Sequence, residues 1–168
     1  MEDGNFNLDE LEALVQQRFG GNQTILDKWI DDSSFADQCF MVLNSPNAQF
    51  NSLYWSILVL INYADRFFCF WEDQARFNFA QSIQELIISN DSVFFNNIQN
   101  LPNPINFDSI IAQYSRLYGL VIAEGWGSDP RFQNFLFEIT ENQPPSIISN
   151  KIYLQILREI CDSMRIIR

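Results

Sequence analysis

The sequence predicts an all-α protein, and three observations lead to this prediction. Apolar residues recur at helical spacing over almost all of the 168 residues, and no run alternates with a period of two over a useful length. Hydrophobic residues make up 47% of the chain, which contains 16 Phe and 4 Trp, so material for a core is ample. Clusters of Asn, Gly and Pro divide the chain into eight helical segments.

The first two helices form a pair. Residues 7–21, NLDELEALVQQRFGG, have Asn7 as a cap, early acidic residues and a Gly-Gly stop. A short second helix, residues 22–32, has an apolar face around Trp29. Its polar face carries Thr24, Asp27, Lys28 and Asp31.

The second pair contains the most apolar segment. The third helix, residues 34–45, opens with Ser34 and has Asp37 three residues later, a relative of the capping box. Residues 52–71 are almost long and apolar enough to span a membrane, but charged residues inside the segment disfavour lipid. One face carries Leu53, Ile57, Leu60, Ile61 and Ala64. The opposite, mixed stripe carries Ser52, Trp55, Ser56, Val59, Asn62, Tyr63 and Arg66. A helix that is apolar nearly all round has neighbours on several sides, which predicts an inner layer.

The third pair is interrupted by a long connection. Residues 72–90 form the fifth helix, and residues 90–106 form a Pro- and Asn-rich connection with room for one short helical turn. The sixth helix, residues 107–124, carries Gln113 and Arg116 on its polar side.

The fourth pair begins after a sharp break, GWGSDP. Asp129 as cap and Pro130 at the first helical position start the seventh helix, residues 131–142. Residues 146–168 form the eighth helix. Its apolar residues span a wider arc than one partner helix covers, so we expect some to lie bare. These residues are Ile152, Tyr153, Ile156, Leu157, Ile160 and Met164.

The pairs recur at a rough period. Their first helices start near Leu8, Phe35, Glu72 and Arg131, spacings that loosely bracket the ~40 to 47 residues of HEAT and armadillo repeats. Periodicity alone leaves both an α-solenoid and an irregular helical bundle open.

Composition excludes several kinds of partner. Ten Lys and Arg against 21 Asp and Glu give a formal charge of −11, which repels nucleic-acid phosphates and anionic lipid headgroups. The acidity suits a basic protein partner, and a role in solubility explains it equally well. The acidic start shows no signal peptide. Cys39, Cys69 and Cys161 are far apart in apolar helical patterns, so we expect buried free thiols in a reducing compartment.

The residue that acid–base catalysis uses most often is missing. The chain has no His, the commonest general base and metal ligand. Asp31 and Asp32 could supply half of a magnesium site, but the sequence has no second acidic cluster at helical spacing to complete it. Gly125-Trp126-Gly127 is not a phosphate loop, because no Lys follows it and no strand precedes it. We therefore expect no enzyme, no cofactor and no metal. A small helical enzyme or ligand carrier would need a closed pocket with converging polar groups.

Several segments together resemble a known family. LDELEALVQQRF, then SSFADQCFMVLNSPNAQFNSLYWSILVLINY, then YSRLYGLVIAEGWGSDPRFQNFLFEIT follow the order seen at the N-terminal end of karyopherin-β nuclear transport receptors, the importin-β and exportin superfamily. The Gly-Trp followed by Asp and Phe is most similar to the exportin-seven branch. The resemblance implies a right-handed α-solenoid of about four HEAT-type helix pairs, with residues 1–168 as one N-terminal domain of a longer solenoid.

The same resemblance implies a function. Second helices of the early repeats would bind the GTP form of the small GTPase Ran, cargo would bind later repeats, and the protein would occupy cytoplasm and nucleus. Trp and Tyr beside Ser, Asn and Arg on residues 52–66 have the composition of a protein-binding surface, although a stripe covered by the next repeat looks the same. The candidate protein-binding residues are Asp27, Asp31, Ser52, Trp55, Ser56, Asn62, Tyr63, Arg66, Gln113 and Arg116. The alternative function is a helical-repeat adaptor unrelated to transport.

Overall fold

The described part of the chain is all-α, as the sequence predicts. The computed structural model describes residues 34–88, 92–142, 151 and 154–162, and these residues contain no strand. The labelled helices are α3 (Ser34–Leu43), α4 (Phe50–Phe67), the 3-10 helix η1 (Phe68–Phe70), α5 (Asp73–Ile88), α6 (Val93–Gln99), α7 (Pro104–Gly125) and α8 (Arg131–Asn142). A further helical segment covers residues 154–162. No helix of this described part is long and apolar enough to cross a bilayer.

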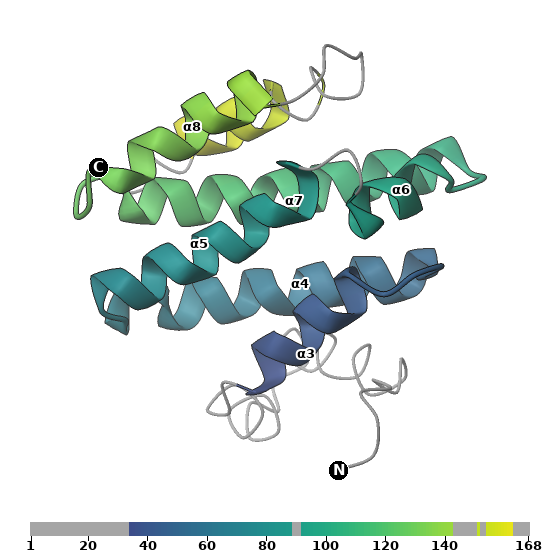
Figure 1. Ribbon diagram of the computed structural model, residues 1–168, viewed down its shortest axis with the longest axis horizontal. Helices are drawn as coiled ribbons and strands as arrows, with labels where there is room; N and C mark the ends of the chain where they lie inside the picture. The colour runs from purple at the N-terminus through teal and green to yellow at the C-terminus, as the bar shows by residue number, and fades with distance from the viewer. Residues whose placement is uncertain (1–33, 89–91, 143–150, 152–153, 163–168) are drawn as a thin grey trace.

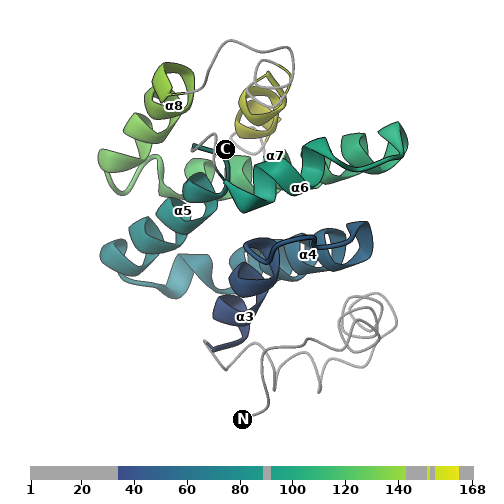
Figure 2. The same cartoon turned by 45° about the vertical axis from the view of Figure 1, so that its right-hand side comes forward.

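The helices stack in a regular order. α4 packs against α3 on one side and α7 on the other, and α5 packs against both α7 and α8 (Figure 1). α6 fills a corner between α5 and α7. Figure 2 shows the same order from a second direction, with residues 154–162 (yellow) above α7 and beside α8.

Local signals explain where three helices begin. The Asp129 carboxylate accepts a hydrogen bond from the Arg131 backbone N–H at 3.0 Å, so the predicted cap of α8 is confirmed. Asn103 caps α7 by accepting from the Ile105 N–H at 2.9 Å, with proline at the first helical position. The Ser92 hydroxyl accepts from the Phe95 N–H at 3.2 Å and opens α6.

One core joins these helices. The face of α4 predicted to be apolar is buried at every position, Leu53, Ile57, Leu60, Ile61 and Ala64. α6 inserts Phe94, Phe95 and Ile98 into the same core, which makes the Pro- and Asn-rich connection a structural element of its own. On α7 the Tyr114 hydroxyl donates a hydrogen bond to the Ile83 carbonyl at 2.8 Å and ties α7 to α5.

The expected bare face at the end of the chain is wrong for Ile156 and Ile160, which are 0% and 4% exposed. A Cβ at Gly119 would lie 2.6 Å from the Glu159 Cβ, so residues 154–162 rest almost directly on the backbone of α7. This close approach buries Ile156 and Ile160, whereas Leu157 is half-buried and Leu154 is exposed. Ile152, Tyr153 and Met164 lie outside the described residues.

Candidate functional site

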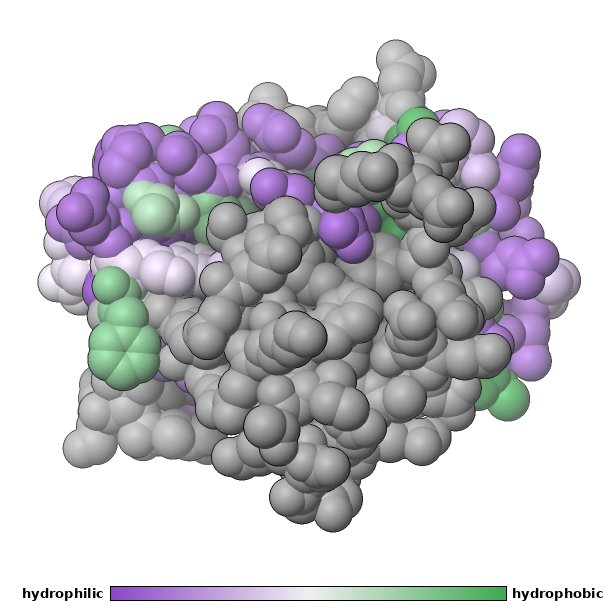
Figure 3. All heavy atoms as spheres, turned by 90° about the horizontal axis from the view of Figure 1, so that it is seen from below, coloured by the Kyte–Doolittle hydropathy of each residue, from purple (hydrophilic) through white to green (hydrophobic). Residues whose placement is uncertain are grey.

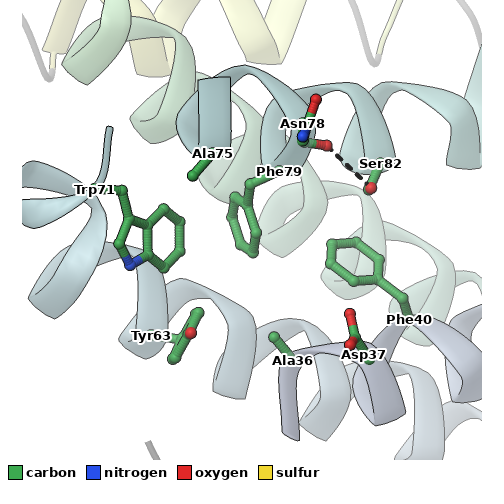
Figure 4. A pocket seen from close by; sticks show the side chains of 9 residues that line it. All are labelled: Ala36, Asp37, Phe40, Tyr63, Trp71, Ala75, Asn78, Phe79 and Ser82. Carbon is green, nitrogen blue, oxygen red and sulfur yellow. Dashed lines mark hydrogen bonds between the residues drawn. The ribbon is translucent and has the colours of Figure 1, made fainter. Parts of the chain in front are cut away.

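An open groove runs between α3 and α5. It contains two adjoining hollows of about 360 and 320 Å³. Asp37, Phe40 and Ser82 line both hollows, so the two form one continuous depression, named here the α3/α5 groove. Figure 4 shows the larger hollow, with α5 above and side chains of α3 and α4 below.

Aromatic rings form the floor of the larger hollow. The Trp71 ring centroid lies 5.1 Å from that of Tyr63 and 5.2 Å from that of Phe79. Phe40 reaches across from α3 and meets Phe79 edge to face at 5.6 Å. Such pairs each add roughly 0.5 to 1.5 kcal/mol beyond the area that they bury. The floor is therefore a rigid apolar surface that connects α3, α4 and α5.

The second hollow is apolar below and acidic at its edge. Met41 and Leu86 supply its apolar walls, and Asn44 and Glu85 supply its polar edge. The Met41 side chain is 58% exposed. Because methionine is flexible and polarisable, an exposed methionine in a groove adapts to differently shaped partners.

Most neutral polar groups of the groove are already engaged locally. The Ser82 hydroxyl donates to the Asn78 carbonyl at 3.0 Å, and the Asn44 amide donates to the Phe40 carbonyl at 2.8 Å (Figure 4 for the first pair). The exposed carboxylates of Asp37 and Glu85 differ, because neither forms an ion pair with a described residue. No Lys or Arg is among the described lining residues, so the groove is apolar with an acidic edge.

The structure distributes the predicted binding residues over different environments. Asp27 and Asp31 lie outside the described residues, and the same holds for the side chain of Arg66. Ser52, Trp55 and Gln113 are partly buried, and Arg116 is exposed on α7. Of the predicted residues whose side chains the structure describes, only Tyr63 lines the α3/α5 groove.

The mixed stripe of α4 is not an open surface at its centre. Ser56 and Asn62 are 0% and 7% exposed, so the prediction that they lie on a binding surface is wrong. The physical reason is that α4 has helices packed on two sides, α3 and α7. Polar side chains that lie within these helix contacts are buried together with the apolar ones. The Ser56 hydroxyl makes no hydrogen bond with the described part of the chain. Tyr63 is also buried, at 8%, but contributes to the groove floor.

Sequence reasoning missed the α3 and α5 walls of the groove. Phe40, Met41, Phe79, Ser82 and Glu85 were not singled out as binding residues. The signal was present on α5, where the groove-lining residues recur three and four positions apart. They are Ala75, Asn78, Phe79, Ser82, Glu85 and Leu86.

The cysteine prediction is correct for one thiol and wrong for another. Cys39 is fully buried, and burial raises the pKa of its thiol. Cys161 is exposed on the last helical segment because its neighbour Ile160 takes the buried face. The side chain of Cys69 is outside the described set.

Within the described ranges, no three His, Cys, Asp or Glu side chains gather in a way that could hold a metal ion. A comparison of the chain with models of protein families, with curated proteins and with solved structures finds no match. The function is therefore argued from the groove.

Proposed function

We propose that this chain is a helical protein-interaction module whose docking site is the α3/α5 groove. The observation that carries the proposal is the aromatic floor of Phe40, Tyr63, Trp71 and Phe79 beneath an open groove with an exposed Met41. Trp, Tyr, Phe and Met are the residues enriched in protein interfaces, and aromatic side chains in packed pockets carry most of the binding energy.

The form of the groove favours a protein segment over a small molecule. Small-molecule sites enclose most of the ligand and orient it with several converging polar groups. Here the Ser82 hydroxyl and the Asn44 amide already donate hydrogen bonds to nearby backbone carbonyls. The depression continues along α5 from Ala75 to Leu86. A long, open, apolar groove of this kind is typical of peptide recognition.

The stacking order supports a second proposal, the HEAT-type solenoid. In a solenoid each repeat packs on the next, so first helices contact first helices and second helices contact second helices. α5 on α8, and α4 on α7, are two of the contacts that this arrangement requires; α3 and α5, which it would also bring together, meet at the ring pair of Phe40 and Phe79. We propose that residues 1–168 form one domain of about four such pairs within a longer right-handed solenoid.

Binding to the GTP form of Ran remains the proposal carried by the sequence resemblance. Arg116 is exposed on α7, and Ser52 and Trp55 are partly exposed on α4, so these side chains are available to a partner. Titration calorimetry with Ran carrying a GTP analogue and with Ran-GDP tests it, because a transport receptor binds the first and discriminates against the second. Equal heats from both forms would exclude a role as a nucleotide-dependent receptor between nucleus and cytoplasm. The adaptor function would then remain.

The docking proposal is tested by site-specific photo-crosslinking in cells that express the full chain. A photoreactive amino acid replaces Met41 in one variant and Ile105, equally apolar and 72% exposed on α7, in the control. We expect an adduct with another protein from position 41 and none from position 105. Ala75→Trp, which fills the larger hollow, should abolish the adduct, whereas Ala112→Trp on the exposed side of α7 should not.

Three outcomes would contradict the docking proposal. They are equal adducts from both positions, an adduct only within the chain itself, or an adduct that survives Ala75→Trp.

A further inference from the structure

We infer that the α3/α5 groove receives an amphipathic helix that carries apolar anchors along one side and Lys or Arg beside them. The inference rests on the proposed docking function and specifies the chemistry of the partner. The shape of the groove indicates a helix, and the charge at its edge indicates basic residues.

The length and walls of the groove fit a short helix. Its lining on α5 runs from Ala75 to Leu86, about 16 Å at 1.5 Å per residue, which equals three turns of a bound helix. Both walls are helices whose backbone groups bond internally, so an extended peptide finds no strand edge to pair with in this described region. Recognition therefore depends on side chains.

The two hollows set the spacing of the anchors. Along α5 the larger hollow is centred near Asn78 and the second near Gln84, about 9 Å apart. Positions i, i+4 and i+7 of a helix, which lie about 6 and 10.5 Å along its axis from the first, bracket this separation. One apolar residue then enters the aromatic hollow and the next lies against Met41 and Leu86.

The charges select a basic partner. Asp37 lines both hollows and Glu85 lines the second; both are exposed and neither is in an ion pair with a described side chain. Carboxylates elsewhere in the described part of the chain form ion pairs where a cation lies near, as Asp129 does with Arg131 and Asp108 with Lys151. The formal net charge of the chain is −11, so a second copy of the chain would be repelled at long range. A basic helix would be attracted instead. Figure 3 shows that hydrophilic side chains dominate the described part of the face seen there.

Three matched synthetic peptides of about three helical turns test the inference by fluorescence anisotropy on the full chain. The first has Leu at i, i+4 and i+7 with Lys beside them, the second has Glu in place of Lys, and the third has Ser in place of Leu. We expect the first to bind, the second to bind at least about tenfold more weakly, and the third not to bind. Added salt should weaken the first complex, because exposed charges are screened beyond about 8 Å at physiological ionic strength.

Charge-neutral variants locate the effect. Asp37→Asn with Glu85→Gln should weaken the Lys peptide by about two- to fivefold for each carboxylate, as expected for exposed ion pairs. Glu124→Gln with Asp162→Asn removes the same charge from exposed positions outside the groove and should leave affinity unchanged. Circular dichroism verifies that both pairs of variants fold.

The outcomes separate this inference from the docking proposal. Equal binding of the Lys and Glu peptides, or equal effects of the two double variants, would overturn the basic partner while leaving the groove as a docking site. If no peptide binds but position 41 still crosslinks specifically to another protein, the helical basic partner is wrong and the docking function stands. If neither experiment reports an occupant, both fall.

Discussion

Replacing Gly125 with alanine should destabilise the protein, although it adds only one methyl group. A Cβ at this position would lie 2.3 to 2.5 Å from three ring atoms of Phe132, where ordinary contacts are 3.4 to 4 Å. The Phe132 ring is fully buried and has to withdraw by about 1 Å in a packed core, where such overpacking costs about 1 to 3 kcal/mol. A cost near 2 kcal/mol corresponds to a fall in Tm of about 4 to 8 °C in a chain of this length.

The same turn supplies the control. A Cβ at Gly127 meets nothing within 4 Å, and its backbone is not in the left-handed region, so Gly127→Ala should leave stability unchanged or raise it slightly. Thermal melts followed by circular dichroism compare the two variants. Phe132→Leu in the Gly125→Ala background should cost less than the two changes added separately, because the smaller side chain relieves the clash. If the Gly125→Ala variant has the same Tm as the wild type, the contact between α7 and α8 is not as described.

Three further predictions concern the core and its ends. Ile160→Glu should lower the free energy of unfolding by several kcal/mol in chemical denaturation, because it buries an unpaired charge. Leu154→Glu, at a position 64% exposed on the same segment, should be nearly neutral. If the two variants are equally stable, Ile160 lies on an exposed face after all. Tyr114→Phe should cost about 1 kcal/mol for the lost bond to a carbonyl, and Tyr118→Phe less, because its buried hydroxyl has no partner of good geometry among the described residues. Burial raises the pKa of both phenols, so stability should fall as the pH rises above about 10, where only the unfolded chain ionises, and the double Phe variant should resist this fall in pH-dependent melts. Hydrogen bonds from the Arg131 guanidinium lower the pKa of Asp129, so Asp129→Ala should lower the free energy of unfolding by about 1 kcal/mol at neutral pH. The difference in stability between this variant and the wild type should shrink as the pH falls below about 4, where the wild-type carboxylate becomes protonated. If the two are equally stable at neutral pH, the cap does not contribute to stability.

Helix starts were predictable where the signal is local. Asp129 and Pro130 form a cap and a first turn within three residues, and α8 begins directly after them. The start of α7 carries the same kind of signal, Asn103 and Pro104, but lay inside a segment interpreted as a connection. The many Asn and Pro residues of that segment favoured a loop interpretation over the cap signal. As a result α7 begins three residues before the expected position.

Burial was predictable for a strongly apolar face and not for a mixed one. Leu53 and Ile57 are buried wherever their helix packs, so periodicity was sufficient. Whether Ser56 or Asn62 faces a partner or a neighbouring helix depends on how α3 and α7 pack against α4, which the sequence of α4 itself does not contain. Phe70 is the opposite case: it lies within an apolar stretch of sequence, but in the 3-10 turn η1 it is 80% exposed.

The α3/α5 groove is a product of tertiary packing, which explains why no motif in the sequence marks it. α3 is anchored mainly on α4, whereas α5 is anchored on α7 and α8, so the two walls of the groove are positioned by different neighbours. The edge-to-face pair of Phe40 and Phe79 connects the walls with two large, stiff rings, and Phe40 lines both hollows. A groove formed before its partner arrives imposes little ordering cost on binding, so even a short helix with two or three anchors retains a useful share of its contact energy. The aromatic residues that close the core on one side thus also provide the contact surface on the other.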